Sequence, residues 1–468
     1  MLQEELTQEQ VPEETKPPRP TFGERLLARE GIIAYLPVIV VVILMFMGAS
    51  WQFTWLHTDA ARYQCYSLTF WLGGGASRLL PGVQCAYLPH SSLIAPPFHA
   101  LPLEYPPLTL LVFTPALLAP LVYYQMTFAI LMALMAVFMY WLLLRDAPRG
   151  AALAFAAYML IGAWATAEAR FDLVPAALTL ICVIAAHRKH WTFAYIALAM
   201  AFLLKIYPLL FLPALFIAEQ QDARRFFTPQ QSVTLASLPV EVWRTLRGLR
   251  HWRWKNTLIF FALLLGVTGL FALLDFQGAV LSQLSYFANR PVQVEASASP
   301  ILFLAAHFGV AGHTAYTFGS INIVSPLGEP VSLVFDVLLV LGYLYTLSLQ
   351  WRGKLEIPQA FIAILLVFIV TGKVFSPQYL MWLMPLLVYT GAYTRFWLLT
   401  WGLISLLTTI IYPYLYTRTL DGTLAPYLPG FVQSVAARDA LLVFLTLAYL
   451  FNWWRIRTSR NTINAASA

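Results

Sequence analysis

The stretch GIIAYLPVIVVVILMFMGASWQ, residues 31–52, contains no charged side chain. A run of this length can cross the ~30 Å hydrocarbon core of a bilayer as one α-helix, and it is too long for the core of a signal peptide. Similar runs recur as far as Trp454, and the chain of 468 residues is 60% hydrophobic and 11% charged. Because lipid offers no water to the backbone, these runs predict an all-α polytopic membrane protein rather than a soluble domain or a barrel.

Basic residues indicate the orientation of the helices. They gather at 25–29, 145–149, 188–189, 224–255, 352–354, 395 and 455–457. Such clusters face the cytoplasm in most membrane proteins, and they account for the net charge of +7 without a nucleic-acid partner. One helix over 192–218 would place the most basic loop outside, so we predict two short helices that turn outside at Lys205 and Pro208.

This reasoning predicts about twelve spans with both termini cytosolic in the plasma membrane. The spans are expected at 32–52, 121–144, 151–168, 173–187, twice within 192–218, and at 257–275, 329–350, 358–372, 378–393, 396–416 and 436–454. They form one transmembrane domain over 31–455, with cytosolic tails at 1–30 (predicted to be disordered) and 456–468, a basic inner loop at 219–256, and outer loops at 53–120 and 276–328. Short apolar segments at 106–120 and 300–310 predict interfacial or re-entrant helices within the outer loops.

Motifs of several enzyme classes are missing from the sequence. We find no P-loop, dinucleotide-binding fingerprint, HExxH zinc site, GxSxG elbow or Asp-x-Asp pair. Chemistry in this chain would therefore use a substrate that is activated without a nucleotide, and no cofactor or divalent metal is expected. Cys65 and Cys85 share the first outer loop, where a disulfide is permitted but not required.

Unusual polar residues fall on the outer side of this topology, and this asymmetry is the main clue to function. They are Asp59, Arg62, Glu104, Arg170, Asp172, Lys205, Arg290, Gln293, Glu295 and Lys373. Each has a structural alternative. Asp59 could simply begin a helix capped by Thr58, and Asp172 could belong to a turn between two helices.

Two lysines stand near the ends of apolar runs, and each is followed within four residues by a proline. Lys205 and Lys373 could each extend to the interface, but together they favour a shared anion site. Arg290 lies in an extended segment fixed by Pro291, where it could grip a phosphate or pair with Glu295.

The order of several segments resembles the GT-C class of polytopic glycosyltransferases. These segments are Asp59 in the first outer loop, EYPPL (104–108), FDLVPAALTL (171–180), LLKIYPLLFLP (203–213), RPVQVEAS (290–297) and KVFSPQYLMWLMPLL (373–387). Within that class the chain is most similar to the family 87 polyprenyl-phosphate-mannose-dependent mannosyltransferases. The resemblance extends from about residue 32 to residue 395. Two features depart from the family: a single Asp replaces an Asp-Glu pair, and the first loop is rich in Gly and Pro (LGGGASRLLPG, 72–82).

The resemblance implies a GT-C fold and an inverting transfer of a sugar, mannose above all, from a polyprenyl-phosphate donor to a lipid or glycan acceptor outside the membrane. Asp59 would be the general base, and Arg290, Lys205 and Lys373 would stabilise the leaving phosphate. The further substrate-binding candidates are Gln293, Glu295, Arg62, Glu104, Tyr105 and Asp172. The alternative is a transporter or flippase of an anionic or lipid-linked substrate, whose site should lie nearer the midplane.

Overall fold

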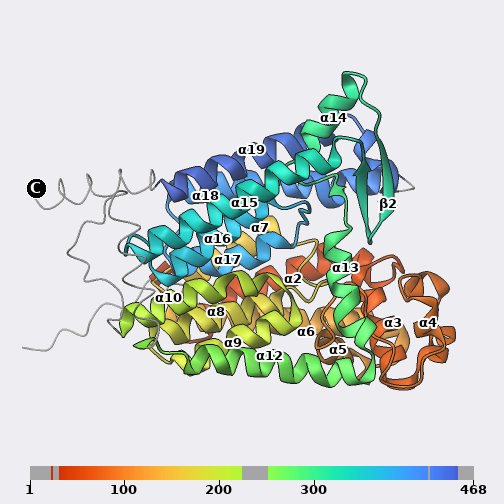
Figure 1. The fold of residues 1–468 in the computed structure, drawn as a ribbon, viewed down its shortest axis with the longest axis horizontal. Coiled ribbons are helices and arrows are strands. Elements are labelled where there is room, and N and C mark those ends of the chain that lie inside the picture. The colour runs from red at the N-terminus through yellow and green to blue at the C-terminus, as the bar shows by residue number, and fades with distance from the viewer. Residues whose placement is uncertain (1–22, 25–30, 224–250, 420–421, 452–468) are drawn as a thin grey trace, which may run out of the picture.

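The computed structural model describes residues 23–24, 31–223, 251–419 and 422–451, which form a helical bundle with one small sheet (Figure 1). The expectations for the two tails, and for most of the inner loop, fall outside these residues. The all-α architecture predicted from the sequence is confirmed.

Six helical segments in the described part of the chain are long and apolar enough to cross a membrane. They are Ile32–Phe53, Leu121–Asp146, Lys255–Leu274, Gly328–Trp351, Arg395–Arg418 and Phe431–Leu450. Their α-helical parts are α2 (Leu36–Ala49), α6 (Tyr124–Asp146), α12 (Lys255–Leu274), α15 (Gly328–Trp351), α18 (Arg395–Thr409) and α19 (Phe431–Leu450). The chain is therefore an integral membrane protein.

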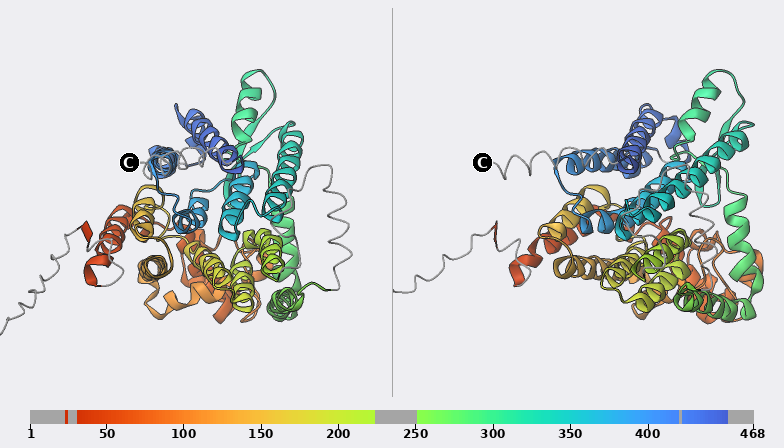
Figure 2. Two further views of the ribbon diagram at one scale, coloured as in Figure 1. Left: turned by 90° about the vertical axis from the view of Figure 1, so that its left-hand side faces the viewer. Right: turned by 60° about the vertical axis from the view of Figure 1, so that its left-hand side comes forward.

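Shorter helices fill the centre of the bundle. They are α7 (Ala151–Gly162), α8 (Leu173–His187), α9 (Trp191–Leu204), α10 (Leu212–Asp222), α16 (Ile357–Thr371) and α17 (Tyr379–Tyr389). Each span expected from the sequence thus contains a helix in its described part, although some end early: α7 ends at Gly162, whereas the expected span runs to residue 168. The views in Figure 2 place α12 and α15 on the perimeter, and only 11% of the apolar window of each is buried, so these two helices face lipid.

The predicted break in the run 192–218 is confirmed. The helix α9 ends at Leu204, Lys205 adopts an extended conformation, and Pro208 stands in the first turn of the short helix Tyr207–Phe211 that leads into α10. The far ends of α9 and α10 meet, because the indole of Trp191 donates to Asp222 at 3.1 Å. The two helices therefore form a hairpin with Lys205 at its turn.

The first long loop lies at one end of the bundle, which we call the loop end. It contains α3 (Asp59–Leu72), α4 (His90–Leu93) and α5 (Thr109–Phe113), and α5 continues as a 3-10 helix over Thr114–Leu118. Cys65 and Cys85 form a disulfide that ties α3 to the following turns. The helix expected at 106–120 is present in this shorter form.

The second long loop lies at the same end. It holds a π-helical turn (Gln277–Leu281), α13 (Ser282–Ala288), β1 (Val292–Gln293), α14 (Ser299–His307), β2 (His313–Thr317) and β3 (Ser320–Val324). The strands form an antiparallel sheet in the order β1-β3-β2, with Val292 opposite Ile323 and Ala315 opposite Asn322. The helix expected at 300–310 is α14. The β2–β3 hairpin was not predicted, although Phe318 and Gly319 at its turn both have positive φ, as hairpin turns of two residues require.

Candidate active site

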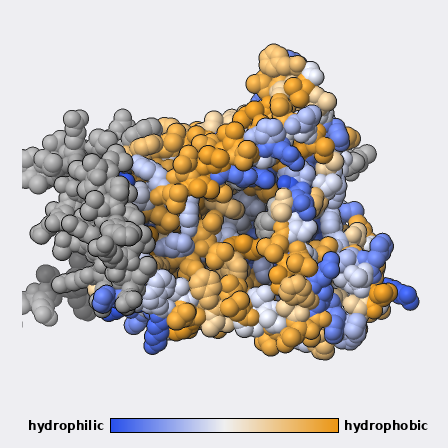
Figure 3. Space-filling view, viewed as in Figure 1, coloured by the Kyte–Doolittle hydropathy of each residue, from blue (hydrophilic) through white to orange (hydrophobic). Residues whose placement is uncertain are grey.

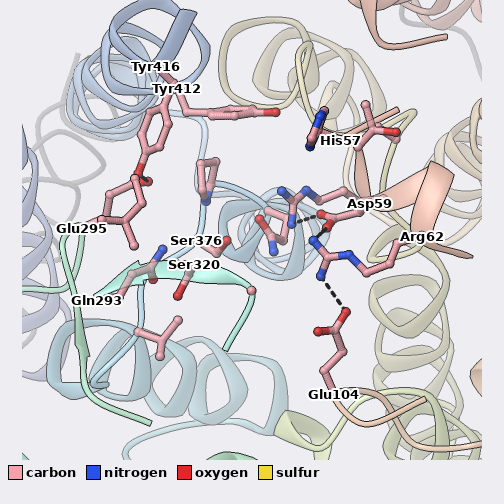
Figure 4. A pocket seen from close by; sticks show the side chains of 18 of the residues that line it. His57, Asp59, Arg62, Glu104, Gln293, Glu295, Ser320, Ser376, Tyr412 and Tyr416 are labelled. Atoms are coloured by element: carbon pink, nitrogen blue, oxygen red, sulfur yellow. Dashed lines mark hydrogen bonds and ion pairs between the residues drawn. The ribbon is translucent and has the colours of Figure 1, made fainter. Parts of the chain in front are cut away.

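A cavity of about 630 Å³ lies at the loop end of the bundle. Its walls come from the end of the first span, from α3, from the α7–α8, α9–α10 and α16–α17 turns, from the sheet, and from the end of α18. Figure 4 shows Asp59, Arg62 and Glu104 on one side of it, facing Gln293, Glu295 and Tyr416 on the other. Segments that are distant in sequence thus share one chamber.

Short helices set the depth of the chamber floor. With a rise of about 1.5 Å per residue, α7 is about 18 Å long, α9 about 21 Å and α16 about 22 Å. A hydrocarbon core is ~30 Å thick, so helices of this length do not span it as the long helices of the bundle can. The chamber floor is therefore recessed relative to the ends of the long spans at the loop end.

Asp59 is the first residue of α3 and lines the chamber. The hydroxyl of Thr58 accepts a hydrogen bond from the Ala61 N–H at 3.1 Å, so the predicted helix cap is present. The Asp59 carboxylate also contacts two guanidinium groups, Arg170 at 2.5 Å and Arg62 at 3.2 Å. Asp59 therefore begins a capped helix and also lines the chamber, so the two alternatives left open by the sequence are both present.

The charges around Asp59 determine its ionisation. Burial opposes the charged form, but the nearby cations Arg170, Arg62 and Lys205 outweigh burial and hold the pKa of Asp59 below its usual value. Asp59 is consequently a carboxylate at neutral pH.

Arg62 bridges two carboxylates on this wall. Its guanidinium contacts Glu104 at 2.7 Å as well as Asp59, and it lies over the ring of Tyr87, 3.8 Å from the ring centroid. Tyr105, from the same EYPPL segment as Glu104, also lines the chamber. The segment thus fixes the arginine that orients Asp59.

Lys205 and Asp172 form a second charged pair at the floor. The Lys205 ammonium lies 2.5 Å from Asp172, which also accepts the Trp382 indole N–H at 2.7 Å. Lys205 lines the chamber, whereas Asp172 is 1% exposed and stands behind it. Asp172 therefore positions Lys205 rather than facing the cavity.

Arg290 is the least neutralised cation of the chamber. Its guanidinium donates to the Ser320 hydroxyl at 2.8 Å and lies over Tyr286, and its Nε has no hydrogen-bond partner in the described part of the chain. Within the described ranges it has no acidic side chain at ion-pair distance. An anion entering the chamber would gain most from this side chain.

Glu295 does not pair with Arg290, which corrects the alternative considered from the sequence. Its carboxylate is held by Arg438 of α19 at 3.1 Å and by the Tyr416 hydroxyl at 3.0 Å. Arg438 has no exposed surface. Glu295 and Gln293 line the chamber, but the carboxylate of Glu295 is already satisfied.

Lys373 is not brought to the same wall as Lys205. It does not line the chamber, and its ammonium lies 3.6 Å from Asp336 of α15. Its backbone carbonyl accepts from the Gln293 N–H at 2.9 Å, so it stands directly behind the strand that does line the chamber.

Sequence reasoning left the role of one residue in the α7–α8 turn open and missed that of another. Arg170 was selected as an unusual polar residue with a simple turn as its alternative, and in the structure it contacts Asp59. Glu168 is 2% exposed, and neither of its carboxylate oxygens has a hydrogen-bond partner among the residues that the structure describes. A charged residue inside an apolar run was the available signal for both.

No group of three or more His, Cys, Asp or Glu side chains in the described part of the chain could hold a metal ion. Asp59 and Glu104 lie on either side of Arg62 instead of converging on a shared point.

Comparisons with known proteins give a structural likeness. No protein-family model matches the sequence, and no curated protein matches it. Among solved structures, the chain is similar to a crystal structure of ArnT from Cupriavidus metallidurans bound to undecaprenyl phosphate. The TM-score is 0.38 and the identity 13%, over 88% of this chain and 77% of that one.

Proposed function

We propose that this chain is an inverting GT-C glycosyltransferase that moves a sugar from a polyprenyl-phosphate donor to a hydroxyl of a lipid or glycan acceptor. The observation that carries this proposal is the pairing, in one recessed chamber, of an ionised carboxylate (Asp59) with an unneutralised guanidinium (Arg290). Sugar transfer from a lipid phosphate needs a base on one side and a phosphate-binding cation on the other. The resemblance of the segment order to family 87 supports the class and favours mannose as the sugar.

Asp59 would act on the acceptor. The acceptor oxygen attacks the anomeric carbon while its proton passes to an Asp59 oxygen, and the configuration at that carbon inverts. Arg170 and Arg62 fix the carboxylate, and each of its oxygens still has lone pairs to accept a proton. Its lowered pKa makes Asp59 a weak base. The proton therefore moves to Asp59 late, when the forming bond to the anomeric carbon has made the acceptor hydroxyl more acidic.

Arg290 would act on the leaving group. The bond between the anomeric carbon and the phosphate oxygen breaks, and its electron pair stays with the polyprenyl phosphate. Negative charge therefore grows on that phosphate, and a preorganised cation stabilises it. Lys205 supports the same charge from the floor, held in place by Asp172. We propose no metal or other cofactor for this step.

The depth and direction of the chamber fit a lipid-linked donor. A polyprenyl phosphate keeps its chain in the membrane, so its phosphate reaches a floor that is recessed relative to the ends of the long spans. Basic residues such as Arg145, Arg188 and Arg352 stand at the opposite end of the bundle, which supports a cytoplasmic position for that end and for both termini. The chamber would then open on the outer face of the plasma membrane.

The test measures transfer with the purified chain in liposomes. Polyprenyl-phosphate mannose, and then other polyprenyl-phosphate sugars, are supplied with a crude lipid extract as acceptor, and release of polyprenyl phosphate is followed. We expect acceptor-dependent release that falls by at least about 100-fold in Asp59→Asn. Asp222→Asn, at the opposite end of the bundle, is the matched control and should retain activity.

The outcomes separate the enzyme from the alternative. Release that is indifferent to Asp59 would contradict the mechanism. Binding of the lipid-linked sugars without any release would instead favour a transporter or flippase.

A further inference from the structure

A charged pair interrupts the lipid-facing wall of the bundle beside the chamber. Asp336 lies on α15 with its side chain 49% exposed, and Lys373 faces it with 31% exposed. The neighbouring exposed residues of α15 are apolar, among them Leu333 and Val337. Figure 3 shows hydrophilic residues beside a hollow in this otherwise hydrophobic face.

The position of Asp336 places this pair inside the membrane. Asp336 follows Gly328 by eight residues, which corresponds to about 12 Å along a helix that is about 36 Å long. A charge at the centre of a membrane helix costs ~2.5–3.5 kcal/mol on insertion scales, and Asp336, a third of the way along α15, bears part of that cost. An apolar residue would avoid that cost, so stability alone does not account for an acid at this position.

The pair is looser than the other ion pairs near the chamber. Its atoms are 3.6 Å apart and both side chains are partly exposed, whereas Lys205 contacts the buried Asp172 at 2.5 Å. The longer separation and the exposure leave the Lys373 ammonium accessible to a second anion, which can replace the acid. Lys373 is thus a cation that can exchange partners.

Lys373 is also connected to the chamber. The residues that follow it, Val374 and Ser376, line the cavity, and its carbonyl binds the backbone of Gln293, which lines it too. Arg290 lies three residues before Gln293 on the same segment. A lipid phosphate moving along α15 would meet Lys373 first and Arg290 next.

We propose that Asp336 and Lys373 form a lateral gate for the lipid-linked substrate. The phosphate of a polyprenyl carrier replaces Asp336 as the partner of Lys373 and passes from there to Arg290, while the chain stays in the membrane beside α15. This inference rests on the proposed donor and adds its route. The proposed ligand of the gate is the polyprenyl phosphate, although a glycerophospholipid carries a similar phosphate.

The gate predicts opposite effects for its two members. In phosphatidylcholine nanodiscs, binding of polyprenyl phosphate is measured for the wild type, Asp336→Asn and Lys373→Met. Asp336→Asn removes the competing anion and should tighten binding about fivefold, whereas Lys373→Met should weaken it about fivefold. Lys373→Arg keeps the charge and should bind within about twofold of the wild type. If Lys373→Met does not fold, Asp336→Asn alone tests the gate. Tighter binding of polyprenyl phosphate to Asp336→Asn supports the gate, and unchanged or weaker binding overturns it.

A second arm identifies the lipid. Phosphatidic acid also carries a phosphate monoester, so equal effects of both variants on its binding would replace the gate by a general anionic-lipid contact. A structural pair would lower the stability of both variants without opposite binding effects, and this too would overturn the proposal. Opposite binding effects without any sugar transfer would leave the gate in place and reject the transferase. Normal sugar transfer with unaltered polyprenyl phosphate binding in both variants would reject the gate and keep the transferase.

Discussion

The guanidinium of Arg170, in the turn after α7, lies 2.5 Å from the carboxylate of Asp59 at the start of α3. The two residues are more than a hundred positions apart in sequence, and their contact joins the first long loop to the floor of the chamber. It also keeps Asp59 ionised against the effect of burial.

Arg170→Gln should move the acid limb of the activity profile. Removing this cation lets burial dominate, so the pKa of Asp59 rises and the variant loses its base at a higher pH than the wild type does. We expect the acid limb of kcat/KM to move up by about 1–2 pH units. The measurement is the pH dependence of polyprenyl phosphate release, with the exposed Arg149→Gln as control. If the acid limb of Arg170→Gln coincides with that of the wild type, Arg170 does not set the ionisation of Asp59.

Arg290→Gln should slow transfer with little effect on folding. The side chain has no acidic partner among the described residues, so its removal leaves no buried carboxylate behind. We expect kcat to fall by about 10²–10³, as for other preorganised charge stabilisers, and Arg290→Lys to recover part of the loss. Ser320→Ala is the control: it removes the hydrogen bond that Arg290 donates and the one that the Ser320 hydroxyl donates to Asn322, but keeps the guanidinium. Equal losses in Ser320→Ala and Arg290→Gln would instead point to a packing defect.

Arg438→Met should destabilise the wall that carries Gln293 and Glu295. Arg438 is fully buried and contacts both Glu295 and Asp439, so its loss leaves two buried carboxylates without a cation. We expect a loss of about 3–5 kcal/mol in the free energy of unfolding. Denaturation in detergent gives the value, and the exposed Arg418→Met should stay within about 0.5 kcal/mol of the wild type. A small loss in Arg438→Met would mean that water or a substrate reaches Glu295.

Much of the candidate site was predictable because charges are rare in this chain. Asp59, Arg62, Glu104, Lys205, Arg290, Gln293 and Glu295 were selected as unusual polar residues, and all of them line one chamber. Lys373 met the same criterion, but the turn after α16 directs it toward Asp336. A sequence pattern places a residue at a helix end and leaves the direction of its side chain open.

The sequence by itself determined the membrane class, the twelve helical segments and the break at Lys205, because hydrophobic length and proline act locally. It also marked the end of the bundle where polar groups gather. Tertiary structure decided the partners: Arg170 with Asp59, Arg438 with Glu295, and Lys373 with Asp336. These contacts join segments far apart in the chain, and ion pairing depends on distances that only the packing of short helices among long ones establishes.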